Sequence, residues 1–315
     1  MNIAVTGGAG FIGANLCRAL ARLDGVGQIL VLDDLSTGRT ENIDDLPGVK
    51  LVEGSILDRE VVDHVLADAH AVVHLAARPS VPRSLLDPVA THEANASGTL
   101  SILEGARRRD PAQRPQVIVA SSSSVYGANP RLPKREDMVP LPRSPYAASK
   151  LAGEAYALAY AESFGLPVLV FRFFNVFGPL QAADHAYAAV VPAFVSAALE
   201  GRPLTVHGDG TQTRDFTFIG SVVAVLVDAV GRRVTHDTPV NLAFGSRVSL
   251  LELIDALEAV LGRSLPREHT QPRPGDVAHS QADQALLRSL FPTVEAVPLD
   301  EGLRLTVDWA RSAGG

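Results

Sequence analysis

The stretch Thr6-Gly7-Gly8-Ala9-Gly10-Phe11-Ile12-Gly13 decides the fold of this chain. It follows a short apolar run, residues 2–6, and precedes a helical pattern that continues to Leu23. Glycines spaced GxxGxxG between a strand and a helix allow a sharp turn, a close approach of backbone to a pyrophosphate, and tight helix–strand packing. We therefore predict a dinucleotide-binding loop at Gly7, Gly10 and Gly13. A tight turn without a ligand is the alternative.

The next apolar run, residues 28–32, ends in Asp33 and Asp34. Asp33 stands 20 residues after Gly13, the distance at which a carboxylate binds the ribose hydroxyls of adenosine. A carboxylate there repels a 2′-phosphate, so NAD is favoured over NADP, although the nearby cation Arg39 would weaken that preference. The alternative is a turn residue at a strand end.

Further apolar runs predict an α/β fold with a doubly wound parallel Rossmann sheet. Strands are expected at 2–6, 28–32, 49–52, 71–75, 116–120 and 168–173, and helices at 58–66, 88–109 and 146–164. Gly98 within the second of these helices indicates close packing. After residue 173 the pattern is less regular, with a helix at 187–199, strands at 204–206 and 239–243, and a helix at 250–261.

We expect two domains. Residues 1–173, to which 214–243 return, would bind NAD, and a smaller domain of residues 174–213 and 244–315 would bind the substrate. The chain has 315 residues and a net charge of −7, which disfavours binding to nucleic acid or to anionic membranes. Cys17 is the single cysteine, and no apolar run is long enough to cross a bilayer, so we expect a cytoplasmic protein.

Metal binding is not expected, because none of the nine histidines has ligand spacing with a partner. His74 lies at an apolar strand end and is interpreted as a hydrogen-bonded core histidine rather than a ligand. Cys17 is expected to pack on the first helix.

Two polar stretches follow the later strands of the predicted sheet. Residues 121–124 are four serines at the carboxyl end of a strand, where the ligand crevice of such a sheet lies. Tyr146 and Lys150 are four residues apart, so both face one side of a helix. A lysine ammonium beside the phenol would lower its pKa from about 10 and make Tyr146 a general base near neutral pH. An unrelated surface pair is the alternative.

Two isolated arginines, Arg214 and Arg273, lie in segments rich in Gly, Thr and Pro. The fork of a guanidinium suits diphosphate binding. Two surface arginines without a ligand explain the pattern equally well.

The chain resembles the extended short-chain dehydrogenase/reductases, and more closely the UDP-glucose and UDP-N-acetylglucosamine 4-epimerases. The matching stretches cover nearly the whole chain: TGGAGFIG from Thr6, LDDLSTG from Leu32, HLAA from His74, SSSSVYG from Ser121, SPYAASK from Ser144, RFFNVFGP from Arg172, GDGTQTRDF from Gly208 and RPGD from Arg273.

This resemblance implies roles for individual residues. The catalytic residues would be Ser122, Tyr146 and Lys150. The NAD-binding residues would be Gly7, Gly10, Phe11, Ile12, Gly13, Asp33, Asp34, Ser36, Gly38, Ser55, Ile56, Leu75, Ala76, Ala77, Asn95, Tyr146 and Lys150. The substrate-binding residues would be Ser84, Ser122, Ser123, Tyr146, Asn175, Ala186, Val190, Val206, His207, Arg214, Arg273, Asp276 and Ser280. Ser55 departs from the family, which usually has Asp there to hold the adenine amino group.

The activity implied is 4-epimerisation of a UDP-hexose through a 4-keto sugar, with NAD regenerated. A 4,6-dehydratase would carry Asp-Glu where this chain has Ser123-Ser124. A UDP-glucuronate 4-epimerase would want an arginine after Pro179, where this chain has Leu180. A catalytically silent NAD-binding homologue is a third alternative.

Two further expectations come from the resemblance. Family members pair the helices equivalent to 88–109 and 147–164 in a four-helix dimer interface, so a homodimer is expected. The position seven residues after Arg273 lines the pocket for the C2 substituent of the sugar and is Ser280 here. A small residue there would admit N-acetylated sugars.

Overall fold

The structure of the chain is a computed structural model that describes residues 1–183, 188–271 and 278–313. The described residues form two compact units. The first contains Met1–Asn129, Val139–Phe173 and Val223–Val240, and the second contains Pro130–Met138, Phe174–Val222 and the rest of the chain from Asn241.

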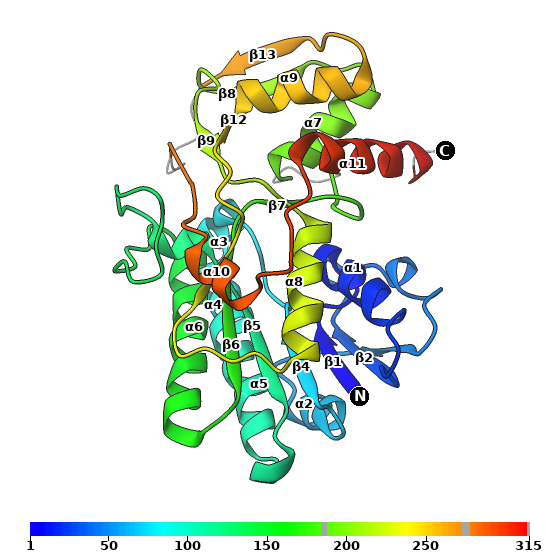
Figure 1. Cartoon of the computed structure of the whole chain (residues 1–315), viewed down its shortest axis with the longest axis vertical. Helices are drawn as coiled ribbons and strands as arrows, with labels where there is room; N and C mark the ends of the chain where they lie inside the picture. The colour runs from blue at the N-terminus through cyan, green and yellow to red at the C-terminus, as the bar shows by residue number, and fades with distance from the viewer. Residues whose placement is uncertain (184–187, 272–277, 314–315) are drawn as a thin grey trace. The chain divides into compact units, whose positions relative to one another are not determined.

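A seven-stranded sheet has the order β11-β6-β5-β4-β1-β2-β3, and its strands β1 to β6 lie within the first unit (Figure 1). The strands are β1 Asn2–Thr6, β2 Gln28–Asp33, β3 Val49–Glu53, β4 Ala71–His74, β5 Gln116–Ser122, β6 Val168–Phe173 and β11 Val240–Leu242. The pairings from β3 through β6 are parallel. The strand order reverses beside β1, which confirms the doubly wound parallel sheet and defines the topological switch point where such sheets bind ligands.

The helices that begin in the first unit connect these strands. They are α1 Phe11–Leu20, α2 Arg59–Leu66, α3 Val81–Leu86, α4 Pro88–His92, α5 Gly98–Arg107 and α6 Pro145–Phe164. One large core cluster lies between the strands and the apolar faces of α2, α5 and α6, with fully buried side chains such as Val62, Ile102 and Ala157. Burial of these side chains is the main stabilising contribution, at about 25 cal/mol per Å² of apolar surface.

Helix α6 shows how local sequence sets its bounds. The Ser144 hydroxyl caps its N-terminus by accepting from the Ala147 N–H at 3.2 Å, and Pro145 occupies the first turn. Gly165 ends the helix in the left-handed conformation, with φ of 62°. These signals place Tyr146 in the first turn.

The predicted helix at 88–109 is in fact interrupted. It consists of α4, a π-helical turn at Glu93–Ser97, and α5. Asn95 in the π turn hydrogen-bonds with the main chain of Arg78 instead of facing solvent. The predicted close packing of Gly98 is confirmed, because a Cβ there would lie 2.3 Å from Ile56 Cδ1.

The described residues of the second unit form short strand pairs and several helices. The strands are β7 Val176–Phe177, β8 Leu204–His207, β9 Thr213–Arg214, β10 Thr217–Phe218, β12 Val248–Ser249 and β13 Arg267–Thr270. The helices are α7 Val190–Leu199, α9 Leu250–Leu261, α10 Ala285–Leu290 and α11 Leu299–Ala313, while α8 Ile219–Gly231 begins here and continues in the first unit. Strands β8 and β13 are parallel, and β9 and β12 are antiparallel. A Ser249–Glu252 capping box starts α9.

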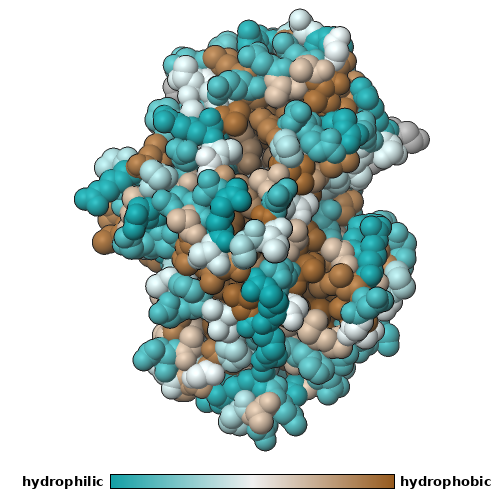
Figure 2. All heavy atoms as spheres, viewed as in Figure 1, coloured by the Kyte–Doolittle hydropathy of each residue, from teal (hydrophilic) through white to brown (hydrophobic). Residues whose placement is uncertain are grey.

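The surface drawn in Figure 2 is mostly hydrophilic, with apolar residues in small groups. The most exposed large apolar side chains of the first unit include Leu85, Leu86, Val89 and Val139, at 64%, 73%, 66% and 70% exposure. Within the described ranges, no helix is long and apolar enough to cross a membrane.

Candidate active site

The glycine loop after β1 is built for close backbone approach. Gly7 has φ of +70°, and a Cβ there would lie 2.7 Å from the Ala76 nitrogen, so only glycine fits. A Cβ on Gly13 would lie 2.2 Å from the Gly7 oxygen. Helix α1 therefore begins against the loop with Gly10 as its N-cap residue. The N-terminus of α1, where Phe11 and Ile12 lie, is a favourable position for a phosphate.

Asp33, at the end of β2, organises this loop. Its Oδ2 accepts from the Ala9 N–H at 2.9 Å and its Oδ1 from the Leu35 N–H at 3.0 Å. Burial raises the pKa of this carboxyl, while the two hydrogen bonds act in the opposite direction. Gly38 packs against Asp33, because a Cβ there would lie 2.9 Å from Oδ1. The predicted ribose ligand thus also fixes the conformation of the loop.

The remaining predicted NAD ligands of this region lie close to the same strand ends. The Asp34 carboxylate accepts from both the N–H and the hydroxyl of Ser36, at 3.0 and 2.6 Å. The Ser55 hydroxyl accepts from the Leu57 N–H at 3.1 Å. Leu75, Ala76 and Ala77 directly follow β4. Because β4, β1 and β2 are parallel neighbours, their carboxyl ends lie at one edge of the sheet.

A buried chain of hydrogen bonds links the strand ends to α5. His74 contacts Thr6 Oγ1 through Nδ1, at 2.7 Å, and Thr99 Oγ1 through Nε2, at 3.0 Å. Burial, with Lys150 second, lowers the pKa of His74 to about 3, so it is neutral at physiological pH. The interpretation of His74 as a hydrogen-bonded core residue is confirmed. Cys17 is likewise buried on α1.

Asn95 connects the π turn to the first turn of α6. Its amide nitrogen donates to Ser149 Oγ at 3.0 Å, and the Ser149 hydroxyl donates to the Tyr146 carbonyl oxygen at 2.8 Å. A π turn inside a helix is frequent at functional sites. Here it turns a polar side chain towards the backbone that carries Tyr146.

Ser122, Tyr146 and Lys150 are brought together at the carboxyl end of β5. Ser122 is the last residue of β5, and its hydroxyl lies near enough to the Tyr146 phenol to lower the pKa of that group. The Lys150 ammonium is buried and donates to the Ala120 carbonyl oxygen at 2.8 Å. Ser122 also caps the short helical turn Ser123–Tyr126 by accepting from the Ser124 N–H at 3.2 Å. The predicted trio therefore shares one site.

The sequence predicted a lowered pKa for Tyr146, and this direction is wrong for the folded protein. Burial raises this pKa, and the nearby Ser122 hydroxyl only partly opposes the effect. Burial also lowers the pKa of Lys150 to about 8. A buried phenol and a buried ammonium both lose hydration, and this desolvation outweighs any benefit the phenolate gains from the neighbouring cation.

Several predicted substrate ligands lie in the second unit. Arg214 in β9 donates to the carbonyl oxygens of Thr213, at 2.9 Å, and Ala278, at 3.3 Å. The Ser280 N–H donates to the Thr213 oxygen at 3.0 Å, so Ser280 lies beside the strand that carries Arg214. Asn175 donates to the Asp215 carbonyl oxygen at 3.2 Å. His207 at the end of β8 is hydrogen-bonded with Thr270 Oγ1 at 2.8 Å.

Other predicted substrate ligands are placed as follows. Val206 is buried in β8, and Val190 begins α7. In the first unit, Ser123 begins the short turn after β5, and the buried Ser84 donates to the Val81 carbonyl oxygen at 2.7 Å. Ala186, Arg273 and Asp276 lie outside the described residues.

One residue of this region was missed by the sequence analysis. Asp215 is fully buried, and its carboxylate accepts from the Ala282 N–H and the Ser246 hydroxyl, both at 2.9 Å. Burial raises its pKa to about 6. Asp215 joins the Arg214 strand to the segments around Ser246 and Ala282. The signal was the acidic residue inside the quoted stretch GDGTQTRDF, directly after Arg214.

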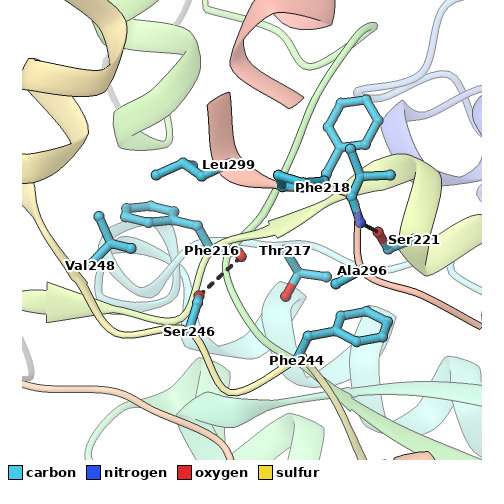
Figure 3. Close-up of a pocket in the computed structure, with 11 residues that line it drawn as sticks. Phe216, Thr217, Phe218, Ser221, Phe244, Ser246, Val248, Ala296 and Leu299 are labelled. Carbon is cyan, nitrogen blue, oxygen red and sulfur yellow. Dashed lines mark hydrogen bonds between the residues drawn. The ribbon is translucent and has the colours of Figure 1, made fainter. Parts of the chain in front are cut away.

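The second unit also contains a hollow of about 160 Å³ (Figure 3). Its lining includes Phe216, Phe218, Phe244 and the buried Thr217, whose hydroxyl has no hydrogen-bond partner among the described residues. None of the predicted site residues lines it. Within the described chain, no three His, Cys, Asp or Glu side chains lie close enough to hold a metal ion.

The fold and the residues at its strand ends define a dinucleotide-binding enzyme with a Ser–Tyr–Lys site. Residues 3–243 match the model of the NAD dependent epimerase/dehydratase family, and the chain belongs to that family. It is NAD-dependent, and its relatives named UDP-sugar 4-epimerases are isomerases.

Three relatives show the range of the family. A UDP-glucose 4-epimerase from Mycolicibacterium smegmatis is 37% identical over 99% of both chains. The structure of a UDP-N-acetylglucosamine 4-epimerase from Methanobrevibacter ruminantium, in complex with UDP-N-acetylmuramic acid, is 34% identical with a TM-score of 0.92, over 99% of this chain and 98% of that one. An NAD-dependent NDP-hexosamine 5,6-dehydratase of tunicamycin biosynthesis, TunA, is 36% identical with a TM-score of 0.88 over the same shares.

Proposed function

We propose that this enzyme interconverts UDP-hexoses that differ in configuration at C4, namely UDP-glucose with UDP-galactose and their N-acetylated forms. The observation that carries the proposal is the placement of the Ser122 hydroxyl at the end of β5, near enough to the Tyr146 phenol to lower its pKa, with Lys150 anchored one turn further along α6. This arrangement holds a phenol and a hydroxyl so that both can contact one sugar oxygen.

The residues of the first unit fit NAD. The Gly7 and Gly13 positions leave no room for a Cβ, and Asp33 presents a carboxylate directly beside the glycine loop. Gly7, Gly10 and Gly13 would lie against the pyrophosphate, Asp33 would accept from the adenosine ribose, and Lys150 would hold the nicotinamide ribose. When bound, NAD accepts the hydride from C4 of the sugar and returns it.

The side chains divide the proton chemistry between them. Tyr146 takes the proton of the 4-hydroxyl and later returns it, while Ser122 hydrogen-bonds with the same oxygen and stabilises the charge that develops there. The 4-keto sugar then presents its other face after rotation about the diphosphate linkage. A cation beside a phenol favours the phenolate, so the positively charged nicotinamide would oppose the effect of burial on the Tyr146 pKa.

We further propose roles for the two units and for a second copy of the chain. The first unit would bind NAD, and the second would bind the UDP-sugar through residues that include Asn175, His207, Arg214 and Ser280. The exposed apolar side chains Leu85, Leu86 and Val89 lie on α3 and α4, which pack beside α6. Such a patch is typical of a covered surface, and we propose a homodimer in which these helices meet their copies.

Two alternatives in the same family are distinguished by specific residues. Dehydration needs an acid and a base beside the serine, and Ser123 and Ser124 provide neither group. A uronate substrate needs a cation for its carboxylate, and Leu180 follows Pro179 where that cation is expected.

The test is a panel of substrates with purified protein. UDP-galactose, UDP-N-acetylgalactosamine and UDP-glucuronate are incubated with enzyme and NAD, and the products are separated and identified. We expect 4-epimers of the first two and no loss of water. Tyr146→Phe is the matched control, because it removes a single oxygen; we expect retained NAD and lost turnover. A dehydrated product, or full turnover by Tyr146→Phe, would disprove the proposal.

A further inference from the structure

A fully buried ion pair lies one helical turn beyond Lys150. Glu154 of α6 and Arg172 of β6 have side chains only 4% and 3% exposed. Arg172 Nη2 donates to Glu154 Oε1 at 2.6 Å, and Arg172 Nε donates to Oε2 at 3.0 Å. This two-point geometry fixes the direction of both side chains and not only their distance. The quoted stretch RFFNVFGP begins with this arginine, for which the proposed function has no role.

Both partners of the pair also contact the segment that carries Ser122. The Ser121 hydroxyl donates to Glu154 Oε2 at 2.8 Å. The Arg172 guanidinium lies over the Tyr126 ring, 4.7 Å from its centre. Ser121 directly precedes Ser122, and Tyr126 ends the short helical turn that begins after it. The ion pair therefore contacts the chain on both sides of Ser122.

Helix α6 is thus attached to β5 at two consecutive residues. Lys150 bonds with the carbonyl oxygen of Ala120, and Glu154 bonds with the hydroxyl of Ser121. The next residue along the strand is Ser122, whose hydroxyl lies near the phenol of Tyr146 on the same helix. The relative position of Ser122 and Tyr146 is consequently set by the attachments at Lys150 and Glu154.

Stability alone is a poor explanation for such a pair. Removing two charges from water costs about as much as their attraction returns, so apolar residues of similar volume often give an equally stable protein. A pair with good geometry does restrict the packing of the elements that carry it. Its position between α6, β5 and β6, against the residues on either side of Ser122, indicates a role in alignment.

We propose that Glu154 and Arg172 are positioning residues that hold Ser122 against Tyr146 for proton transfer. This proposal rests on the proposed function of the Ser–Tyr–Lys site. Neither residue touches the sugar or takes part in a covalent step. Their effect is carried by Ser121 and Tyr126 on the strand side and by α6 on the tyrosine side.

The test compares three changes in the full-length enzyme with NAD. Glu154→Met combined with Arg172→Met replaces the pair by apolar groups of similar length, so that no charge is left buried alone. Ser121→Ala is the mild variant and removes only the link between Glu154 and the strand. Val170→Ala is the control, because it perturbs the buried core of β6 two residues before Arg172 and leaves the ion pair intact.

We expect the double variant to lose about tenfold or more in kcat, within the range that aligned proton transfer contributes, with KM changed less than about twofold. The half-maximal pH of kcat should rise, because the Ser122 hydroxyl, which lowers the pKa of Tyr146, is no longer held beside the phenol. Ser121→Ala should show the same two shifts at smaller size. Val170→Ala should lose thermal stability because it leaves a cavity in the core, while its pH profile stays that of the wild type.

The outcomes separate the two proposals. The positioning role would be overturned if kcat and its pH profile were unchanged both in the folded double variant and in Ser121→Ala. It would also be overturned if Val170→Ala showed the same pH shift as the double variant. If the double variant does not fold, the kcat and pH profile of Ser121→Ala alone decide whether the positioning role holds. If wild type epimerises none of the sugars, the proposed function fails; the absorbance titration of Tyr146, measured as the difference from Tyr146→Phe, then tests the positioning role without substrate.

Discussion

The ammonium group of Lys150 donates a hydrogen bond to the main-chain oxygen of Ala120, at 2.8 Å. The contact holds the first turns of α6 against β5, two residues before Ser122. It also places a cation in a buried site, where loss of hydration lowers the pKa of Lys150 to about 8. Lys150 therefore has an anchoring contact in the protein itself, in addition to its predicted bond with the nicotinamide ribose.

A comparison of Lys150→Met with Lys150→Arg should show how much of the role of Lys150 depends on its positive charge and how much on the position of that charge. The methionine removes the ammonium, so we expect about a hundredfold or greater loss of kcat, as for other groups that support proton transfer, and weaker retention of NAD. The arginine keeps the charge but cannot place it in the same volume, and an intermediate loss is expected. The measurements are epimerase kinetics and the NAD content of the purified protein. Normal NAD content and normal kcat in Lys150→Met would contradict the assignment.

Asp33 is expected to decide between NAD and NADP. Asp33→Asn keeps the shape of the side chain but removes the charge that would repel a 2′-phosphate. We expect the ratio of NADP affinity to NAD affinity to rise by about tenfold, corresponding to about 1.4 kcal/mol. The measurement is fluorescence titration of cofactor-free protein with both dinucleotides.

The control for Asp33 is the neighbouring carboxylate. Asp34 is exposed and bonds with Ser36, so Asp34→Asn should leave the ratio nearly unchanged. If the ratio of NADP affinity to NAD affinity were the same in Asp33→Asn and wild type, the carboxylate would only stabilise the loop, by accepting from the Ala9 and Leu35 N–H groups.

The buried carboxyl of Asp215 is expected to make the free energy of unfolding depend on pH. Its pKa is raised from 3.8 to about 6, because burial penalises the charged form. The folded protein therefore binds this proton more tightly than the unfolded chain does, so the stability gained from it is present at low pH and is lost as pH rises through about 6. Linkage gives a loss of about 1.4 kcal/mol in the free energy of unfolding between about pH 5 and 7.5.

Asp215→Asn should remove that pH dependence. The amide is neutral throughout, and it can accept from the Ala282 N–H while donating to the Ser246 hydroxyl. The measurement is urea unfolding of both proteins at the two pH values, and the quantity compared is the change with pH rather than the absolute stability. Asp237→Asn is the control, because that side chain is 92% exposed. Parallel pH curves for wild type and Asp215→Asn would contradict the prediction.

The proposed dimer can be tested on its exposed apolar patch. Leu86→Lys combined with Val89→Lys places two charges where a second copy is expected, and should yield a monomer by light scattering at micromolar concentration. The side chains are 73% and 66% exposed, so the variant should remain folded by circular dichroism. Val139→Lys changes a similarly exposed residue of the same unit, at 70%, and should leave the dimer intact. A monomeric wild type would rule the dimer out.

The sheet could be predicted from sequence because its strands are short, apolar runs bounded by glycine or polar residues. The trio Ser122, Tyr146 and Lys150 could also be predicted, since a strand end and a helical period of four residues place them. The direction of the Tyr146 pKa could not, because it depends on how deeply the phenol is buried, a property of packing rather than of spacing. The interruption at Glu93–Ser97 was missed for a similar reason: Asn95 leaves the helical pattern to bond with Arg78, 17 residues away.

The contacts of buried polar groups could not be predicted from the sequence either. The role of Asp215 depends on contacts with Ser246 and Ala282, 31 and 67 residues further along the chain. The same holds for Glu154, which looks in sequence like one more polar residue of an alanine-rich helix. Only the fold shows that its partner is Arg172, on a neighbouring strand.

Ser280 is predicted to decide whether N-acetylated sugars are accepted. Its N–H bonds with the Thr213 oxygen at 3.0 Å, and Arg214, the predicted diphosphate ligand, follows Thr213 directly. A serine here leaves room for an acetamide beside C2 and offers it a hydroxyl. Ser280→Tyr should fill that room, lowering kcat/KM for UDP-N-acetylgalactosamine by about tenfold or more, because overpacking a fitted pocket costs about 1–3 kcal/mol. Activity on UDP-galactose should fall much less.

Ser280→Ala is the control: it keeps the space, so both substrates should still react, with the acetylated one losing only the hydroxyl contact. If Ser280→Tyr slows both sugars equally, or if the wild type ignores the acetylated one, Ser280 does not line the C2 pocket.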